Sequence, residues 1–275
     1  MPGITDATTL SVHDERGCAI RAGGVATCWR FDVSGVEAPA TADVKLDAPT
    51  RIVVTRGLAC ALVAGGGVSC FNTEADVGRD SVYTPRRMPG LDDAVDLAVH
   101  SDYAFALRRG GAVVRLSLGK YPTPPASHVT VPGAVQLTIG EGYGCARTDA
   151  GVVWCWGSNW MGALGDGTLE DHAARPVVPL APALEIAGGS AHVCARHAGG
   201  SVSCWGSNQF GQVGVRSSGL SDARPTPVRV PGVTAEALVA TDAGTCAITT
   251  KHELVCWGSD NGEASGPSRM RLSEP

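Results

Sequence analysis

The stretch GCARTDAGVVWCWGSNWMGALGDG, residues 144–167, decides the fold of this chain. It places Cys145 and Cys155 ten positions apart, on either side of the turn signal DAG at 149–151. Aliphatic and aromatic residues flank the second cysteine, and a glycine-spaced segment follows. Residues of this kind on both sides of a glycine turn are typical of two short antiparallel strands. The stretch therefore predicts a β-hairpin.

The same spacing recurs along the whole chain. All ten cysteines fall into five pairs ten positions apart, at 18 and 28, 60 and 70, 145 and 155, 194 and 204, and 246 and 256. A sixth segment, AFALRRGGAVVRL, fits the frame with Phe105 and Arg115 at the cysteine positions. The six copies begin 40 to 52 residues apart, which is the period of propeller blades or solenoid turns.

Each copy predicts four short strands. An aliphatic run precedes the two cysteine segments, and a proline-flanked run often follows them. In five of the six copies a glycine stands one residue past the midpoint of the paired positions, where a hairpin loop requires a left-handed residue. These glycines are Gly24, Gly66, Gly111, Gly151 and Gly200. The sixth copy has Lys251-His252 there, so we expect its turn to differ. Four antiparallel strands repeated six times predict an all-β fold, a β-propeller.

Three segments of the chain resemble a known repeat. VVWCWGSNWMGALGDG, SVSCWGSNQFGQVG and HVCARHAGGSVSCWGSN are similar to the regulator of chromosome condensation repeat, in a cysteine-bearing form of bacterial type. The resemblance covers essentially the whole chain and is strongest in the last three copies. It implies a β-propeller, usually with seven blades, whereas this chain has six copies.

We therefore expect a single β-propeller domain over residues 1–275, with six four-stranded blades. The expected repeats are approximately 1–45, 46–90, 91–133, 134–182, 183–232 and 233–275. The N-terminal MPGITDATTLSV has the phase of VPGVTAEALVA, and the C-terminal SRMRLSEP resembles the strand that precedes such a start. We expect the C-terminal strand to close the ring by pairing near the N-terminus. Seven blades or an open fragment of a larger ring are the alternatives.

The cysteine pairs predict disulfides. A hairpin that turns near residue 150 places Cys145 opposite Cys155, at a Cα separation of about 4.5–5.5 Å that a disulfide tolerates. Two of the twelve equivalent positions lack cysteine, and both belong to one copy, as expected if each pair is bonded internally. We expect the disulfides Cys18–Cys28, Cys60–Cys70, Cys145–Cys155, Cys194–Cys204 and Cys246–Cys256. Zinc sites use shorter spacings, so neither a metal nor a cofactor is expected.

Charge and composition limit the cellular compartment and the kinds of partner that we expect. Five disulfides indicate an oxidising compartment, extracellular or periplasmic. The N-terminal residues lack signal-peptide features, so either the protein is not secreted by the general route or a signal has been removed. The net charge of −5 disfavours a nucleic-acid partner. No run approaches twenty apolar residues, so no membrane span is expected. We expect a monomer.

Function is expected in the variable loops before each first cysteine, which converge on one rim if the repeats are in phase. As a secreted or periplasmic binding module, the chain would recognise a protein or glycan with Arg16, Arg56, His100, Tyr103, Tyr143, His192 and the loop residue Trp160.

An enzyme is the first alternative, a lyase, hydrolase or isomerase with its active site at the channel mouth. His100 or His192 would be the general base and Glu141 their neighbour, Arg56 would stabilise an anion, and Tyr143 would donate a proton. No independent catalytic signature such as GxSxG or HExxH occurs, which favours binding. A second alternative is a protein inhibitor similar to propeller-type β-lactamase inhibitors.

Overall fold

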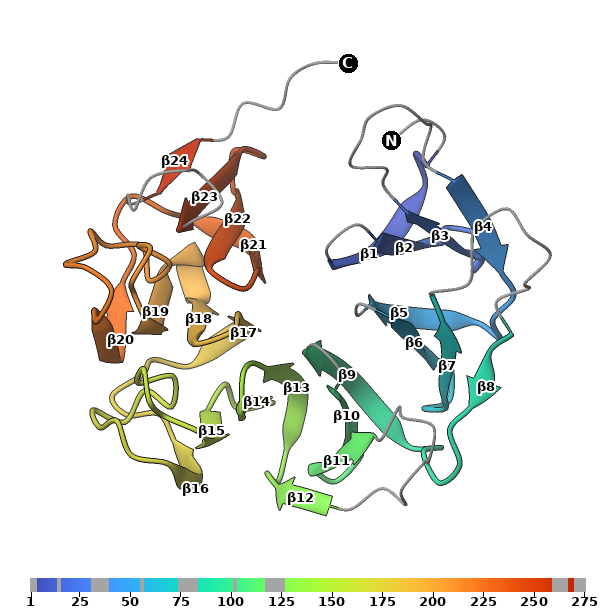
Figure 1. The fold of residues 1–275 in the computed structure, drawn as a ribbon, viewed down its shortest axis with the longest axis horizontal. Coiled ribbons are helices and arrows are strands. Elements are labelled where there is room, and N and C mark those ends of the chain that lie inside the picture. The colour runs from blue at the N-terminus through green and yellow to red at the C-terminus, as the bar shows by residue number, and fades with distance from the viewer. Residues whose placement is uncertain are drawn as a thin grey trace. The chain divides into compact units, whose positions relative to one another are not determined.

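The computed structural model describes residues 4–13, 16–30, 40–54, 57–73, 84–100, 103–116, 127–258 and 267–269 (Figure 1). These residues form six four-stranded antiparallel sheets, and each sheet takes its strands in chain order. The 3-10 turn Ala198–Gly200 is the only helical element of the described part. The fold is the expected all-β one, with six four-stranded propeller blades. None of the described helical segments is long and apolar enough to span a membrane.

The chain divides into two compact units, residues 1–130 and 131–275. The first unit holds three blades. The first blade comprises β1 (Ala7–His13), β2 (Arg16–Arg21), β3 (Ala26–Arg30) and β4 (Ala40–Val44). The second comprises β5 (Pro49–Val54), β6 (Leu58–Val63), β7 (Val68–Asn72) and β8 (Arg86–Arg87). The third comprises β9 (Ala94–His100), β10 (Tyr103–Arg108), β11 (Ala112–Leu116) and β12 (Ser127–Thr130).

The second unit also holds three blades. The fourth blade comprises β13 (Ala134–Ile139), β14 (Tyr143–Thr148), β15 (Val153–Gly157) and β16 (His172–Pro176). The fifth comprises β17 (Ala183–Gly188), β18 (His192–His197), β19 (Val202–Ser207) and β20 (Ala223–Arg229). The sixth comprises β21 (Ala235–Ala240), β22 (Gly244–Thr249), β23 (Leu254–Gly258) and β24 (Ser268–Arg269). The single domain that we expect from the sequence stays a prediction.

The C-terminal strand belongs to its own repeat in the described residues. β24 pairs with β23 through Val255 opposite Arg269 and Cys256 opposite Ser268. The first blade is likewise complete from residues 7–44. Closure of the ring by the C-terminal strand stays a prediction, and residues 270–275 lie outside the described part.

All five expected disulfides are confirmed. In each of the five blades concerned, the two cysteines stand directly opposite each other on the second and third strands. Their Cα atoms lie 4.0–4.1 Å apart. Each bond closes a short loop and contributes about 2–3 kcal/mol by restricting the unfolded chain. Because aromatic residues make up only 5% of the chain, these bonds supplement a core of small aliphatic side chains.

The turn residue of each hairpin has the expected left-handed backbone. Gly151, for example, has a φ of 81°. A Cβ atom there would also lie 2.9 Å from the carbonyl oxygen of Ala183 in the next blade, so both backbone and packing require glycine. In the sixth blade the same position is His252, which takes a φ of 58°. The sixth turn therefore differs in residue type, as expected, but keeps the left-handed conformation.

The third blade preserves the register without the disulfide. Phe105 stands directly opposite Arg115, as Cys60 stands opposite Cys70 in the preceding blade. The geometry required for a sixth disulfide is thus already present in the backbone.

We predict that the double substitution F105C/R115C forms this sixth disulfide. Its closed loop has the same length as the other five, so the expected gain in unfolding free energy is about 2–3 kcal/mol. Urea denaturation under oxidising conditions measures the gain, with F105S/R115S as the matched variant that cannot form a bond. Two free, alkylatable thiols in the folded double-cysteine variant would contradict the register.

Candidate functional site

Among the described residues of the second unit, five connecting segments form a loop face. In an antiparallel sheet, the connection from the first to the second strand and that from the third to the fourth leave at the same end. In the second unit these segments are 140–142, 189–191 and 241–243, with the longer 158–171 and 208–222. We call these five segments the loop face.

Backbone hydrogen bonds join the three short segments in a row. The backbone N–H of Glu141 donates to the Ser190 carbonyl at 2.7 Å. The backbone N–H of Ser190 donates in turn to the Asp242 carbonyl at 3.1 Å. Equivalent loop tips of three successive blades are therefore held side by side, and Glu141 and Asp242 are both exposed there.

The residues expected at the rim differ in how exposed they are, and some lie outside the described part. Glu141 is exposed, and Trp160 is 54% exposed in segment 158–171. In the first unit, Arg16 is half-buried at the start of β2. His100 and Tyr103 stand opposite each other at the end of the β9–β10 hairpin, but their side chains lie outside the described part. The whole of Arg56 also lies outside it.

Tyr143 is buried, so its expected role as an exposed anchor or proton donor at the rim is wrong. Its hydroxyl lies 2.8 Å from the Gly189 carbonyl oxygen and 2.7 Å from that of His192, both in the fifth blade. Burial raises the pKa of the Tyr143 phenol above its ordinary value. A side chain at Gly140 would collide with the Tyr143 ring. Tyr143 thus fills the space between two blades and links them.

His192 has the same role one blade later, and its expected exposure is also wrong. It is fully buried, and its Nε2 lies 2.8 Å from Thr245 Oγ1 in the sixth blade. Any side chain at Gly189 would collide with the His192 ring. Burial lowers the pKa of His192 to about 4. The imidazole is therefore neutral near pH 7 and cannot reach a dissolved substrate on the loop face.

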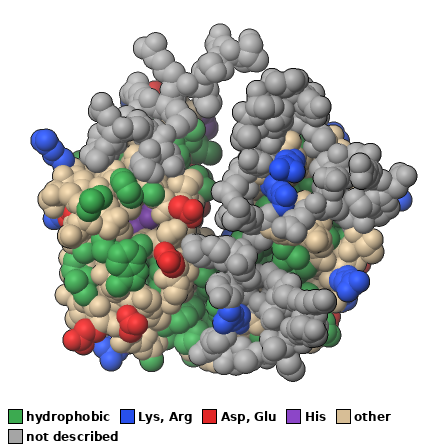
Figure 2. All heavy atoms as spheres, viewed as in Figure 1, with side chains coloured by type: hydrophobic (Ala, Val, Ile, Leu, Met, Phe, Trp, Pro, Cys, Tyr) green, Lys and Arg blue, Asp and Glu red, His purple; other side chains and the backbone are tan. Residues whose placement is uncertain are grey.

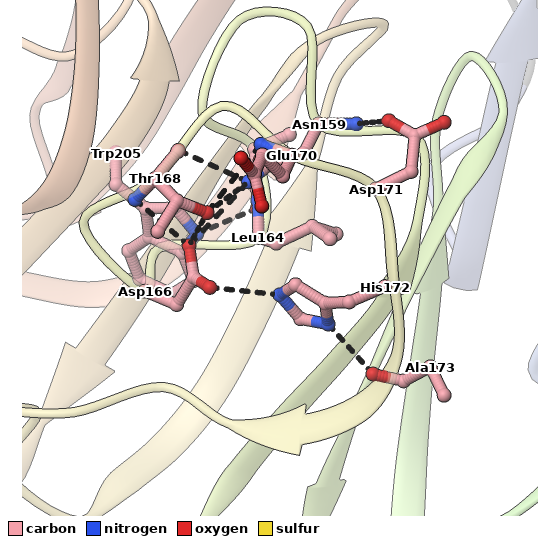
Figure 3. Close-up of polar contacts among 10 residues, drawn as sticks. Asn159, Leu164, Asp166, Thr168, Glu170, Asp171, His172, Ala173 and Trp205 are labelled. Carbon is pink, nitrogen blue, oxygen red and sulfur yellow. Dashed lines mark hydrogen bonds and ion pairs between the residues drawn. The ribbon is translucent and has the colours of Figure 1, made fainter.

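Segment 158–171 is braced by a buried asparagine (Figure 3). Asn159 Oδ1 accepts the backbone N–H of Leu164 at 2.9 Å, and Nδ2 donates to the Thr168 carbonyl at 3.0 Å. The Asn159 backbone N–H donates to Asp171 Oδ1 at 2.8 Å. One fully buried side chain thus ties both halves of the loop together.

An acidic residue reinforces the same loop. The Asp166 carboxylate accepts hydrogen bonds from the Thr168 backbone N–H at 3.0 Å and from its hydroxyl at 2.9 Å. It also lies 3.1 Å from His172 Nε2. Burial by itself raises the pKa of Asp166, but the hydrogen bonds from Thr168 and the charge of His172 outweigh it and lower the pKa. Asp166 therefore stays ionised as a structural acceptor.

Segment 208–222 repeats the brace. Asn208 Oδ1 accepts the backbone N–H of Val213 at 3.2 Å, and Nδ2 donates to Asp222 Oδ2 at 2.8 Å. Asn208 is fully buried, like Asn159. The repeated GSN tripeptide was the available sequence signal for these two residues, which the sequence reasoning did not single out.

The repeated tryptophans fasten each long loop to the next blade. Trp205 Nε1 donates to the Ala163 carbonyl at 2.8 Å, and Trp257 Nε1 donates to the Gln212 carbonyl at 2.8 Å. Both indole rings are fully buried. The two loops are therefore fixed from within by asparagine and from the neighbouring blade by tryptophan.

We predict that acidification destabilises the fold through His192. Its pKa lies below the unfolded value near 6.5, so its contribution is complete above that pH and is lost as pH falls toward about 4. The loss reaches about 3 kcal/mol at most. Denaturant titrations between about pH 7.5 and about pH 4.5 should show a smaller loss for His192→Gln than for the unmodified chain. The exposed His252→Gln serves as control, and equal pH slopes for all three proteins would contradict the prediction.

Comparison with known proteins supports the fold. Residues 184–212 match the model of the regulator of chromosome condensation (RCC1) repeat. A search of curated protein sequences finds no match.

Solved structures with the same fold cover nearly the whole chain. Yeast RCC1 (Prp20), in a crystal structure with Kap60, is 16% identical with a TM-score of 0.75, over 96% of this chain and 75% of the other. Prp20p from Saccharomyces cerevisiae gives 16% identity and a TM-score of 0.75, over 96% and 77%. Human WBSCR16 gives 16% identity and a TM-score of 0.71, over 98% and 83%. The chain thus has the β-propeller fold, and residues 184–212 of its fifth blade match the RCC1 repeat model, in agreement with the repeat resemblance seen in the sequence.

Proposed function

We propose that this chain is a protein-binding propeller that acts in an oxidising compartment and uses the loop face. The observation that carries the proposal is the pair of braced loops. They hold Trp160 and Phe210 at 54% and 39% exposure on segments that are otherwise fixed by buried asparagines. Exposed aromatic side chains on rigid loops are typical binding anchors, because little conformational entropy is lost when a partner covers them.

The five disulfides support the choice of compartment. Reducing conditions in the cytosol disfavour such bonds, whereas secreted and periplasmic proteins keep them. Nine of the ten cysteines are buried, and the tenth, Cys246, is half-buried. The bonds are therefore built into the blades.

Binding is better supported than catalysis. Of the five residues that an active site would use, Tyr143 and His192 lie buried between blades, where they link one blade to the next. Yeast Prp20p is described with binding properties to Gsp1p and histones, and yeast RCC1 (Prp20) with Kap60 bound. These propellers share the fold, and their use of protein partners is consistent with the proposal.

Site-specific photo-cross-linking tests the proposal. A photoreactive phenylalanine analogue is placed at Glu141 or Phe210 on the loop face, and at Val152 or Thr250 at the opposite end of the blades. We expect protein cross-links in the secreted or envelope fraction of the source organism from the first two positions only, because only they lie on the binding surface. Cross-links from Val152 or Thr250 alone, or from no position in any fraction, would contradict the proposal.

A further inference from the structure

The loop face is acidic. Its exposed charged residues are four carboxylates, Glu141, Glu170, Asp171 and Asp242, against one cation, Arg216. Asp222, also in a long loop, is buried and lies 3.0 Å from Arg224 Nε. At the opposite end of the same blades, the connecting segments 149–152, 177–182, 198–201, 230–234 and 250–253 carry only Asp149, Lys251 and Glu253 as acidic or Lys/Arg residues. Among the described connecting segments, four exposed carboxylates therefore lie on the loop face and two acidic residues, Asp149 and Glu253, at the opposite end.

The same face presents four large apolar side chains in a repeated arrangement. Each long loop has an exposed aromatic residue near its start and an exposed leucine near its end. The exposures are 54% for Trp160 and 52% for Leu169, then 39% for Phe210 and 74% for Leu220. Single exposed apolar residues are normal, but a pattern repeated in adjacent blades indicates a binding surface. Figure 2 shows hydrophobic and acidic side chains gathered together over this unit.

The two long loops form one continuous surface. Gln209 Nε2 lies 3.9 Å from Met161 Sδ, so the first parts of the loops are in contact. The backbone N–H of Gly167 donates to the Pro225 carbonyl at 2.8 Å, which attaches the first loop to β20 of the fifth blade. The anchors are thus held in a fixed relation before any partner arrives, which lowers the entropic cost of binding.

From this geometry we infer that the loop face binds a basic segment of a partner protein, one that carries large apolar side chains between its lysines and arginines. The inference rests on the proposed function and specifies its partner. The aromatic and leucine side chains supply the buried apolar contact. The carboxylates attract and orient the cationic segment, so binding weakens as salt increases. A neutral glycan would stack on the rings and donate hydroxyl hydrogen bonds to the carboxylates, but its binding would lack the salt dependence expected of a cationic segment.

Selection from a random peptide library tests the inference on the full, oxidised chain. Phage-displayed peptides of about 16 residues are selected on the unmodified protein and counter-selected on W160S/F210S. We expect the selected sequences to be enriched in Lys and Arg together with Leu, Ile or aromatic residues. Their affinity for W160S/F210S should be weaker by a factor of about ten or more. V152S/I248S is the matched control, because it removes two apolar side chains of 42% and 47% exposure away from the loop face.

Charge is tested separately on the same peptides. Glu141→Gln with Glu170→Gln should weaken binding and flatten its salt dependence between about 0.05 M and about 0.5 M NaCl. Asp149→Asn with Glu236→Gln makes the same change in net charge at other exposed positions and should leave binding unchanged. Circular dichroism and thermal melting of every variant confirm that the fold is retained.

Three outcomes would overturn the inference. The first is a selected peptide set without basic and apolar enrichment, and the second is binding that V152S/I248S weakens as much as W160S/F210S. The third is self-association of the chain that W160S/F210S abolishes, which assigns the surface to a second copy. Loop-face cross-links at Glu141 and Phe210 to a partner without a basic apolar segment would contradict the inference but not the proposed function.

Discussion

The register of the central hairpin in each blade is the constraint on which the rest depends. Once Cys145 stands opposite Cys155, Tyr143 must stand opposite Gly157, and the turn falls at Gly151. The fifth blade repeats this arrangement, with His192 opposite Gly206. A slip of one residue would turn every side chain of the strand to the other face. The disulfides fix this register covalently in five of the six blades, and the contacts between blades follow from it.

In the fourth, fifth and sixth blades a glycine follows the tryptophan that comes after the second cysteine, and this glycine depends closely on the register. Gly157 and Gly206 both have a φ of 102°, and a Cβ atom at either would collide with a carbonyl oxygen of the short loop opposite. The ladder to the fourth strand is irregular at both, as expected of a β-bulge. The bulge bends the chain out of the sheet, and the long loop begins there. The WGSN sequence thus sets the position at which the third strand ends and the long loop begins.

The hairpins, disulfides and left-handed turns could be predicted from the sequence because each is decided within one repeat. The direction of Tyr143 and His192 could not, because it depends on the next blade. Tyr143 reaches the Gly189 and His192 carbonyls of the next blade, and His192 reaches Thr245 of the blade after it. Both rings fit only because Gly140 and Gly189, in their own blades, carry no side chain. From the sequence, a tyrosine or histidine at the start of a strand is expected to lie exposed at the rim. Only the nearby glycine shows that its ring has room to turn inward. The paired glycines in IAGGSAH were the one available indication.

Both long loops share the buried asparagine that holds their backbone, while other residues of the loops differ. Asn159 and Asn208 hold the backbone of both loops in the same way, so neighbouring residues can change without loss of shape. In the fifth blade Asp222 is followed two residues later by Arg224, which pairs with it. In the fourth blade the residue two after Asp171 is Ala173, and Asp171 stays exposed. The common brace thus preserves the scaffold, while a single difference between repeats leaves one carboxylate neutralised by its neighbour and displays the other on the surface.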